Sequence, residues 1–142
     1  MKGINVGRVV AGGLLAGLVI TIGEAILNTV VIGADWERAM TAMGITQSAG
    51  EMVYYVVGAF VIGIVGVGLY AAMRPRMGAG PTTAVEAGVV LWLLAWAWPT
   101  GAMVFWHLLP GTTIVIALVW GLVEVCLAML AGAWLYREDV AA

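Results

Sequence analysis

The chain has 142 residues, of which 63% are hydrophobic and only 10% are charged. A soluble domain usually carries about 25% charged residues, and the mean hydropathy here is +1.07. The composition therefore excludes an ordinary soluble domain and favours an all-α integral membrane protein, with the lipid bilayer as its surroundings. The net charge of −2 comes without a basic cluster, so we expect no nucleic-acid partner.

Four apolar runs are each long enough to cross a bilayer, which takes roughly 20 apolar residues. They predict one four-helix membrane domain, with helices over about residues 7–31, 49–73, 84–106 and 112–136. Between the first two runs, DWERAMTAMG (35–44) places Ala39, Met40 and Met43 on one side of a helix. That pattern predicts a short interfacial helix, with Trp36 at the membrane surface.

Two sequence patterns predict where the second and third membrane helices begin. Ser48 with Glu51, and Thr83 with Glu86, match the capping box. In that motif a hydroxyl accepts from the third helical N–H while the carboxylate reaches back.

Two prolines are expected to disturb these helices. Pro75 disfavours helix in the residue before it, so we expect the second helix to end just before it. Pro99 removes one backbone hydrogen bond inside the third helix, which predicts a kink.

The basic residues predict the orientation of the chain. Only Arg38 lies on one side of the predicted membrane, whereas five basic residues lie on the other: Lys2, Arg8, Arg74, Arg76 and Arg137. Because Lys and Arg are enriched in cytoplasmic segments, we expect a bacterial inner (cytoplasmic) membrane protein with both termini in the cytoplasm.

The second and fourth helices end in similar sequences, GVGLYAAMR and AGAWLYR. Each places Leu-Tyr before an arginine at the predicted cytoplasmic surface. Two tandem hairpins would produce this similarity, as parallel repeats do in some transporters. Independent use of Tyr and Arg as interfacial anchors would also produce it.

Glu24 and Glu124 are the two acidic residues that neither a helix end nor a loop explains. At 1.5 Å rise per residue, Glu24 lies roughly 24 Å from Arg8, and Glu124 lies roughly 20 Å from Arg137. Both therefore fall near the middle of the membrane, where an ionised residue costs about 2.5–3.5 kcal/mol to insert. Such residues are functional candidates by default.

Both acids share a helix face with small residues. Gly13, Gly17, Thr21, Glu24 and Asn28 fall within roughly 80° of one another around the first helix. Glu124 lies on a similar narrow stripe of the fourth helix. We therefore predict an intramembrane polar site made of four residues: Glu24, Glu124, Asn28 and Thr21.

Small residues let membrane helices approach closely, because lipid removes the hydrophobic drive for association. The residues expected to serve helix packing are Gly13, Gly17, Gly63, Gly66 and Gly121. Gly13-xxx-Gly17 matches a GxxxG pattern. Its role is either packing inside one bundle or a dimer face, and the first is the more common.

Trp92, Trp96 and Trp120 lie deeper than the tryptophans of the interfacial belts. They are candidates for the lining of a ligand pocket, or for bulk that packs against small-residue grooves. His107 has no second ligand at metal-binding spacing, and Cys126 has no partner for a disulfide. We expect no metal and no cofactor.

Three segments, GRVVAGGLLAGLVITIGE, LYAAMRPRMGAGP and GLVEVCLAMLAGAWLYRE, resemble a group of small uncharacterised bacterial four-helix membrane proteins. The resemblance covers nearly the whole chain and implies topology, but no activity or ligand. The chain is also loosely similar to the small multidrug-resistance transporters, which have four short helices and an acidic residue in the first. Glu24 occupies the comparable place, although Glu124 and the greater length depart from that pattern.

No catalytic motif occurs in the chain, so we expect a protein that is not an enzyme. The first hypothesis is a structural or accessory subunit, in which both glutamates join helices by hydrogen bonds. The alternative is a small proton- or cation-linked transporter or channel that uses them as its binding site. A bundle this small also predicts a homo-oligomer or a subunit of a larger membrane complex.

Overall fold

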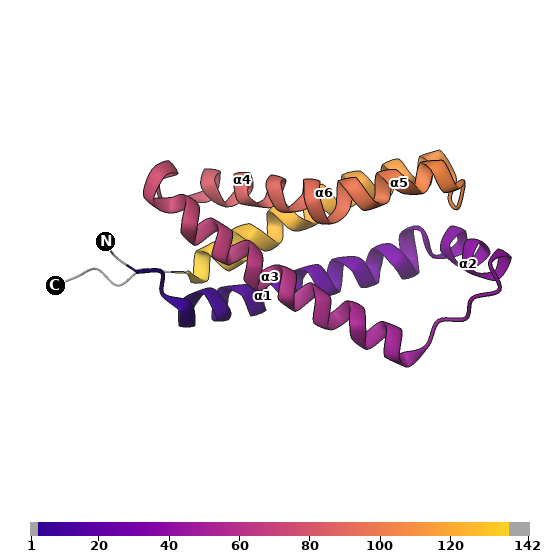
Figure 1. Cartoon of the computed structure of the whole chain (residues 1–142), viewed down its shortest axis with the longest axis horizontal. Coiled ribbons are helices and arrows are strands. Elements are labelled where there is room, and N and C mark those ends of the chain that lie inside the picture. The colour runs from indigo at the N-terminus through magenta and orange to yellow at the C-terminus, as the bar shows by residue number, and fades with distance from the viewer. Residues whose placement is uncertain (1–2, 137–142) are drawn as a thin grey trace.

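The computed structural model describes residues 3–136, which form helices joined by short turns (Figure 1). Four helical spans in this range are long and apolar enough to cross a membrane: Val6–Val31, Ala49–Met77, Pro81–Trp106 and Gly111–Leu135. The prediction of an all-α protein with four membrane-length helices is therefore confirmed.

Two of the four spans contain a π-helical segment. The first span consists of α1 (Val6–Ile26) and η1 (Leu27–Val31), and the third consists of α4 (Pro81–Trp92), η2 (Leu93–Ala97) and α5 (Trp98–Trp106). The second span, α3 (Ala49–Met77), and the fourth, α6 (Gly111–Leu135), are continuous α-helices. A short helix, α2 (Gly33–Ala42), follows the first span.

Side-chain caps account for the beginnings of α1 and α3. The Asn5 carboxamide oxygen accepts a hydrogen bond from the Arg8 N–H at 3.0 Å. Ser48 Oγ accepts from the Glu51 N–H at 3.2 Å, which is the predicted capping contact. Each cap satisfies one of the backbone donors that the first turn of a helix leaves unpaired.

The predicted start of the third span was wrong by three residues. The span begins at Pro81 rather than at residue 84, and Gly80 precedes it. Proline is favoured at the first helical position because its fixed φ suits the helix and no partner is needed for an N–H there. Thr83 is consequently buried inside the first turn, where its hydroxyl donates to the Gly78 carbonyl at 2.8 Å.

The predicted end of the second span, at residue 73, was also wrong. Helix α3 continues through Pro75 to Met77, and the Gly78 N–H closes its last turn on the Arg74 carbonyl at 2.9 Å. Proline removes one backbone donor. Only two helical residues follow Pro75, so α3 ends within the turn that contains the proline.

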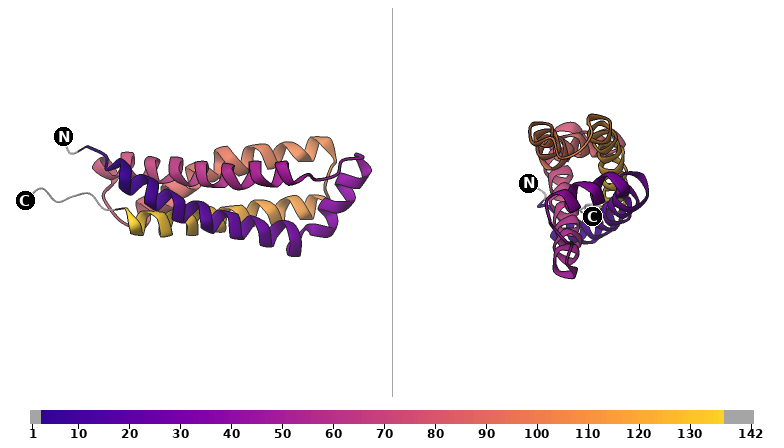
Figure 2. Two further views of the ribbon diagram at one scale, coloured as in Figure 1. Left: turned by 90° about the horizontal axis from the view of Figure 1, so that it is seen from below. Right: turned by 90° about the vertical axis from the view of Figure 1, so that its right-hand side faces the viewer.

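The four spans pack around a common axis (Figures 1 and 2). Helix α1 contacts α3 and α6, and α4 also contacts α3 and α6. One end of the bundle carries Arg74, the turn between α3 and α4 and the last turn of α6, and is called the Arg74 end. The opposite end carries α2 and the turn between α5 and α6, and is called the α2 end.

Glycines set the close approach of α1 to its neighbours in the half nearer the Arg74 end. A methyl group at Gly17 would lie 2.7 Å from the Cα of Phe60, and one at Gly63 would lie 2.6 Å from the Gly17 nitrogen. Gly13 packs in the same way against the backbone of Ile64. The Gly13-xxx-Gly17 stripe is thus occupied by α3 of the same chain.

Helix α2 packs across the end of the bundle that is named after it. Ala39 is buried together with Leu109 and Ile114, and Trp36 packs beside them. The Thr113 hydroxyl donates to Asp35, which ties the first turn of α6 to α2. Met43, expected on the same side of this helix as Ala39 and Met40, follows its last residue, Ala42, and is exposed.

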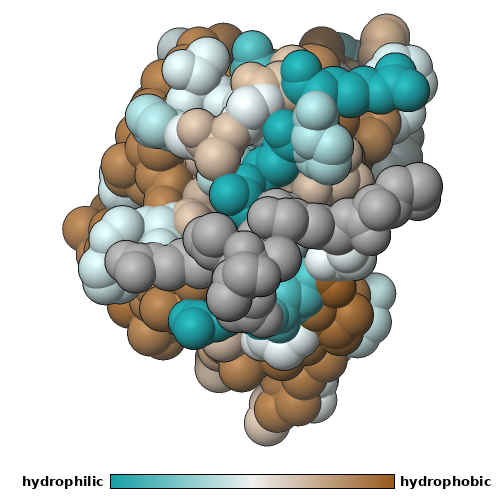
Figure 3. Space-filling model, turned by 90° about the vertical axis from the view of Figure 1, so that its left-hand side faces the viewer, coloured by the Kyte–Doolittle hydropathy of each residue, from teal (hydrophilic) through white to brown (hydrophobic). Residues whose placement is uncertain are grey.

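The two Leu-Tyr sequences meet at the Arg74 end. The rings of Tyr70 and Tyr136 pack edge to face, with centroids 6.0 Å apart. The guanidinium carbon of Arg74 lies 5.8 Å and 5.2 Å from the two ring centroids, within cation–π range. Hydrophilic surface gathers across this end of the molecule (Figure 3). Lys2 and Arg137, which entered the orientation prediction, lie outside the described residues.

Candidate intramembrane acidic site

Glu24 lies in the last turn of α1, and both of its carboxylate oxygens accept hydrogen bonds. The Trp96 indole N–H donates to Oε1 at 2.9 Å, and the Asn28 carboxamide donates to Oε2 at 2.8 Å. The same Asn28 nitrogen also donates to the Glu24 backbone carbonyl at 2.9 Å. Glu24 therefore joins the first span to the third through Trp96.

Each π-helical segment supplies one hydrogen-bond donor to this carboxylate, since Asn28 lies in η1 and Trp96 lies in η2. The second segment has a local cause in Pro99, whose ring would clash with the Ala95 carbonyl in a regular α-helix. The wider π-helical turn separates the Pro99 ring from the Ala95 carbonyl. In this turn the Trp98 N–H bonds the Leu93 carbonyl, five residues back rather than four. The disturbance predicted at Pro99 is thus a π segment, a feature often found at functional sites.

Glu124 reaches the same place from α6. A methyl group on Gly23 would lie 2.6 Å from the carboxyl carbon of Glu124, so this side chain lies directly against α1 beside Glu24. The Trp96 ring that donates to Glu24 also packs on Gly121, which lies one turn before Glu124 in α6. The structure therefore brings both acids together within one chain.

Glu124 is only half satisfied by hydrogen bonds. Its side chain is 5% exposed, and Oε2 accepts from the Trp120 indole N–H at 3.0 Å. Oε1 is buried and has no hydrogen-bond partner among residues 3–136. Buried polar atoms in native proteins nearly always have a partner, so an atom without one calls for an explanation such as a bound proton, water or ion.

The three deep tryptophans act through their indole N–H groups. Trp96 and Trp120 donate to the two glutamates, and Trp92 donates to the Leu118 carbonyl at 3.0 Å. Trp96 also lies over Gly121, where a methyl group would come within 2.7 Å of the indole Cδ1. Gly121 therefore makes room for the ring that binds Glu24.

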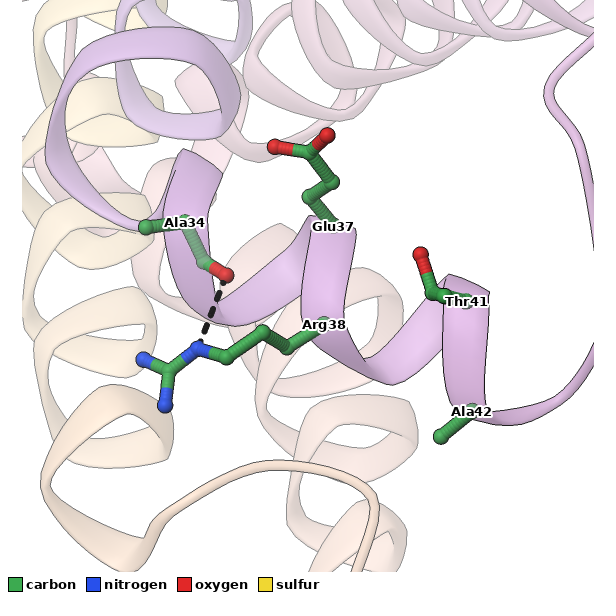
Figure 4. Close-up of a pocket in the computed structure, with 5 residues that line it drawn as sticks. All are labelled: Ala34, Glu37, Arg38, Thr41 and Ala42. Atoms are coloured by element: carbon green, nitrogen blue, oxygen red, sulfur yellow. Dashed lines mark hydrogen bonds between the residues drawn. The ribbon is translucent and has the colours of Figure 1, made fainter.

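Two depressions of the molecule lie away from these tryptophans. One of about 540 Å³ lies along α2 and is lined by Ala34, Glu37, Arg38, Thr41 and Ala42 (Figure 4). In it, Arg38 Nε donates to the Ala34 carbonyl at 3.1 Å. The other, of about 320 Å³, lies between α3, α4 and α6 and includes Tyr70, Gly80 and Trp134. Neither is lined by Trp92, Trp96 or Trp120.

Other predicted site residues take different positions. The Thr21 hydroxyl donates to the Gly17 carbonyl of its own helix at 2.8 Å, so it does not bond either acid. Gly66 packs against Met129 of α6. His107 is exposed and left-handed, with φ of 51°, where α5 ends. Within residues 3–136, no three His, Cys, Asp or Glu side chains form a group that could hold a metal ion.

Sequence reasoning missed two contacts of the acidic site. The bond from Trp96 to Glu24 joins residues 72 positions apart, which no local spacing reveals. Gly23, against which the Glu124 carboxyl group packs, directly precedes Glu24 in the sequence. It was not among the glycines predicted to serve helix packing. By contrast, Trp120 precedes Glu124 by one helical turn, and their bond follows from that spacing.

Comparisons of the chain with models of known protein families, with curated proteins and with solved structures found no match.

Proposed function

We propose that this protein is a non-enzymatic integral membrane protein that binds and releases a proton at the Glu24–Glu124 pair, as a small proton-linked transporter or channel. The observation that carries the proposal is the buried Oε1 of Glu124, which has no hydrogen-bond partner among residues 3–136. A proton on this oxygen would neutralise the group where charge is most costly.

The chemistry of the pair supports a single exchangeable proton. Two neighbouring carboxylates repel each other, and one proton shared by them removes that repulsion. The oxygens of Glu24 are occupied by Trp96 and Asn28, whereas Glu124 keeps one oxygen that can carry the proton. We assign proton exchange to Glu124, and we assign to Glu24 the hydrogen bonds to Trp96 and Asn28 that fix the position of the pair.

A structural or accessory subunit is the second candidate, and one observation favours it. Both oxygens of Glu24 are used in bonds, one of which links the first span to the third. In this candidate the pair holds the bundle together and exchanges nothing. It leaves the unpartnered oxygen of Glu124 unexplained, which is why we rank it second.

Three further features complete the proposal: its orientation, its membrane and its assembly. Arg8, Arg74 and Arg76 gather toward the Arg74 end and Arg38 lies in α2, which supports a cytoplasmic Arg74 end. A bacterial inner membrane is the setting we propose. Exposed apolar side chains on all four spans are compatible with lipid and with further copies or other subunits, so we propose a homo-oligomer or a larger complex.

Proton flux into liposomes that contain the purified protein tests the proposed function. With an imposed membrane potential and a pH-sensitive dye inside, the unmodified protein should conduct protons, and Glu124→Gln should lower the rate at least about tenfold, because an amide does not take up a proton in this range.

Glu37→Gln is the matched control, because this acid is exposed on α2. It should leave the flux unchanged. Absence of flux in the unmodified protein, or equal flux in Glu124→Gln, would overturn the proposal and favour the accessory subunit.

A further inference from the structure

The depression of about 320 Å³ between α3, α4 and α6 lies at the edge of the membrane-spanning part of the bundle. Its walls come from the first turn of α4, at Pro81 and Ala84, and from the last two turns of α6, at Leu130, Ala133 and Trp134. At 1.5 Å rise per residue, all five lie within about 8 Å of the ends of their spans. The depression is therefore at the depth where a bilayer changes from hydrocarbon to headgroups.

The polarity of the depression changes along the membrane normal. Its deeper walls, Ala84 and Leu130, are apolar, whereas its outer rim carries the Gly80 backbone and the Trp134 indole. Trp134 is 70% exposed, and exposed tryptophans gather at the headgroup level of membranes. An apolar wall below a polar rim matches a phospholipid, whose acyl chains and headgroup change polarity in the same direction.

Tyr70 places a hydroxyl group at the polar end of the depression. Its side chain is 4% exposed, and its oxygen accepts a hydrogen bond from the Gly80 N–H at 3.3 Å. A tyrosine hydroxyl is also a donor, and within residues 3–136 the Tyr70 O–H itself has no acceptor. Buried polar groups normally have partners, so the depression offers a hydrogen bond to an acceptor oxygen of a ligand.

The charge beside this hydroxyl group is positive. Arg74 follows Tyr70 by one turn of α3, and its guanidinium carbon lies 5.8 Å from the Tyr70 ring centroid. Arg76 is exposed in the last turn of the same helix. Glu86 of α4 lies about 160° around its helix from Ala84, on the opposite side from the depression. An arginine beside a hydroxyl donor suits a phosphate group, because both donate to its oxygens.

We propose that this depression binds an anionic phospholipid, with its phosphate near Tyr70 and Arg74 and one acyl chain along Ala84 and Leu130. A phospholipid with a cationic headgroup group is disfavoured, because that cation would meet the basic end of the bundle. A free phosphate ion would leave the apolar walls uncovered. The lipid site goes beyond the proposed proton exchange and does not depend on it, since neither intramembrane acid lines the depression.

Native mass spectrometry of the purified protein in a mild detergent tests the lipid site without measuring transport. The probes are phosphatidylglycerol and phosphatidylcholine with identical acyl chains, each added over a range of concentrations. We expect the first phosphatidylglycerol to bind at least about fivefold more tightly than the first phosphatidylcholine, because one basic residue near the membrane surface favours an anionic headgroup by about this factor.

Separate variants test the charge and the shape of the site. Arg74→Gln should reduce the preference for phosphatidylglycerol to less than about twofold, whereas Arg74→Lys keeps the charge and should retain the preference. Ala133→Leu fills the depression and leaves every arginine in place, so it should weaken binding of phosphatidylglycerol at least about fivefold. The matched controls are Arg38→Gln at the α2 end and Ala25→Leu on the exposed face of α1, and neither should change binding.

Equal affinity for the two lipids would overturn the proposal, and so would unchanged binding of phosphatidylglycerol in Ala133→Leu. An undiminished preference in folded Arg74→Gln would overturn it as well. Displacement of the bound lipid by excess inorganic phosphate would identify a site for the free anion and not for a phospholipid. None of these measurements involves proton flux, so the lipid site and the proposed function can fail separately.

Discussion

Gly63→Ala should strongly destabilise the bundle. The added methyl group would lie against the Gly13 carbonyl and 2.6 Å from the Gly17 nitrogen. Both obstacles are backbone atoms of α1, which cannot turn away as a flexible side chain can. We expect the free energy of unfolding to fall by about 1–3 kcal/mol, the usual cost of an overpacked core.

Gly58→Ala is the matched control for this change. Gly58 lies five residues earlier in α3, and a methyl group there would have no described atom within 4 Å. It should raise stability by up to about 1 kcal/mol, the difference in helix propensity between Ala and Gly. Unfolding by a denaturing detergent, followed by circular dichroism, measures both variants. Equal stabilities would contradict the close approach of α1 and α3.

The two glutamates should respond differently to replacement by leucine. Glu24→Leu removes the acceptor of the Trp96 and Asn28 side-chain donors. Asn28 keeps its bond to the residue 24 backbone carbonyl, so the Trp96 indole N–H is the donor left without an acceptor. A donor left unpaired costs about 1–3 kcal/mol, so we expect a loss of about 1–3 kcal/mol. Glu124→Leu leaves one indole N–H unpaired but removes an unpartnered buried oxygen. Its net effect should stay within about 1 kcal/mol of zero.

The same unfolding measurement distinguishes these outcomes, and Glu37→Leu controls for loss of an exposed charge. A smaller loss for Glu24→Leu than for Glu124→Leu would contradict the assignment of Glu24 as the anchor and Glu124 as the exchangeable group. It would also contradict the hydrogen-bond pattern on which that assignment depends.

The sequence alone predicted the four spans, because apolar length and charge placement report directly on membrane insertion. It also placed both acids inside the first and fourth spans, where the structure has them. What it could not predict depends on contacts between spans. Glu24 and Glu124 meet because α1 and α6 run antiparallel past each other, with Gly23 leaving space for the Glu124 carboxyl group.

Two helix boundaries were predicted wrongly because one sequence rule competed with another. Thr83 and Glu86 match a capping box, but the preference of Pro81 for the first helical position decides where α4 begins. Pro75 was expected to end the second helix, yet α3 continues two residues beyond it. The π segments were not predicted at all, because their widened turns depend on Pro99 in one case and accompany the Asn28 bonds in the other.

Infrared difference spectroscopy of the membrane-embedded protein tests the central claim most directly, because it detects a carboxyl proton without requiring transport. Stepping the pH should produce a protonated carboxyl C=O band that shifts in D2O, and Glu124→Gln should abolish this band. Glu37→Gln should leave it intact. An unchanged band in Glu124→Gln would contradict the claim that this buried pair binds and releases a proton.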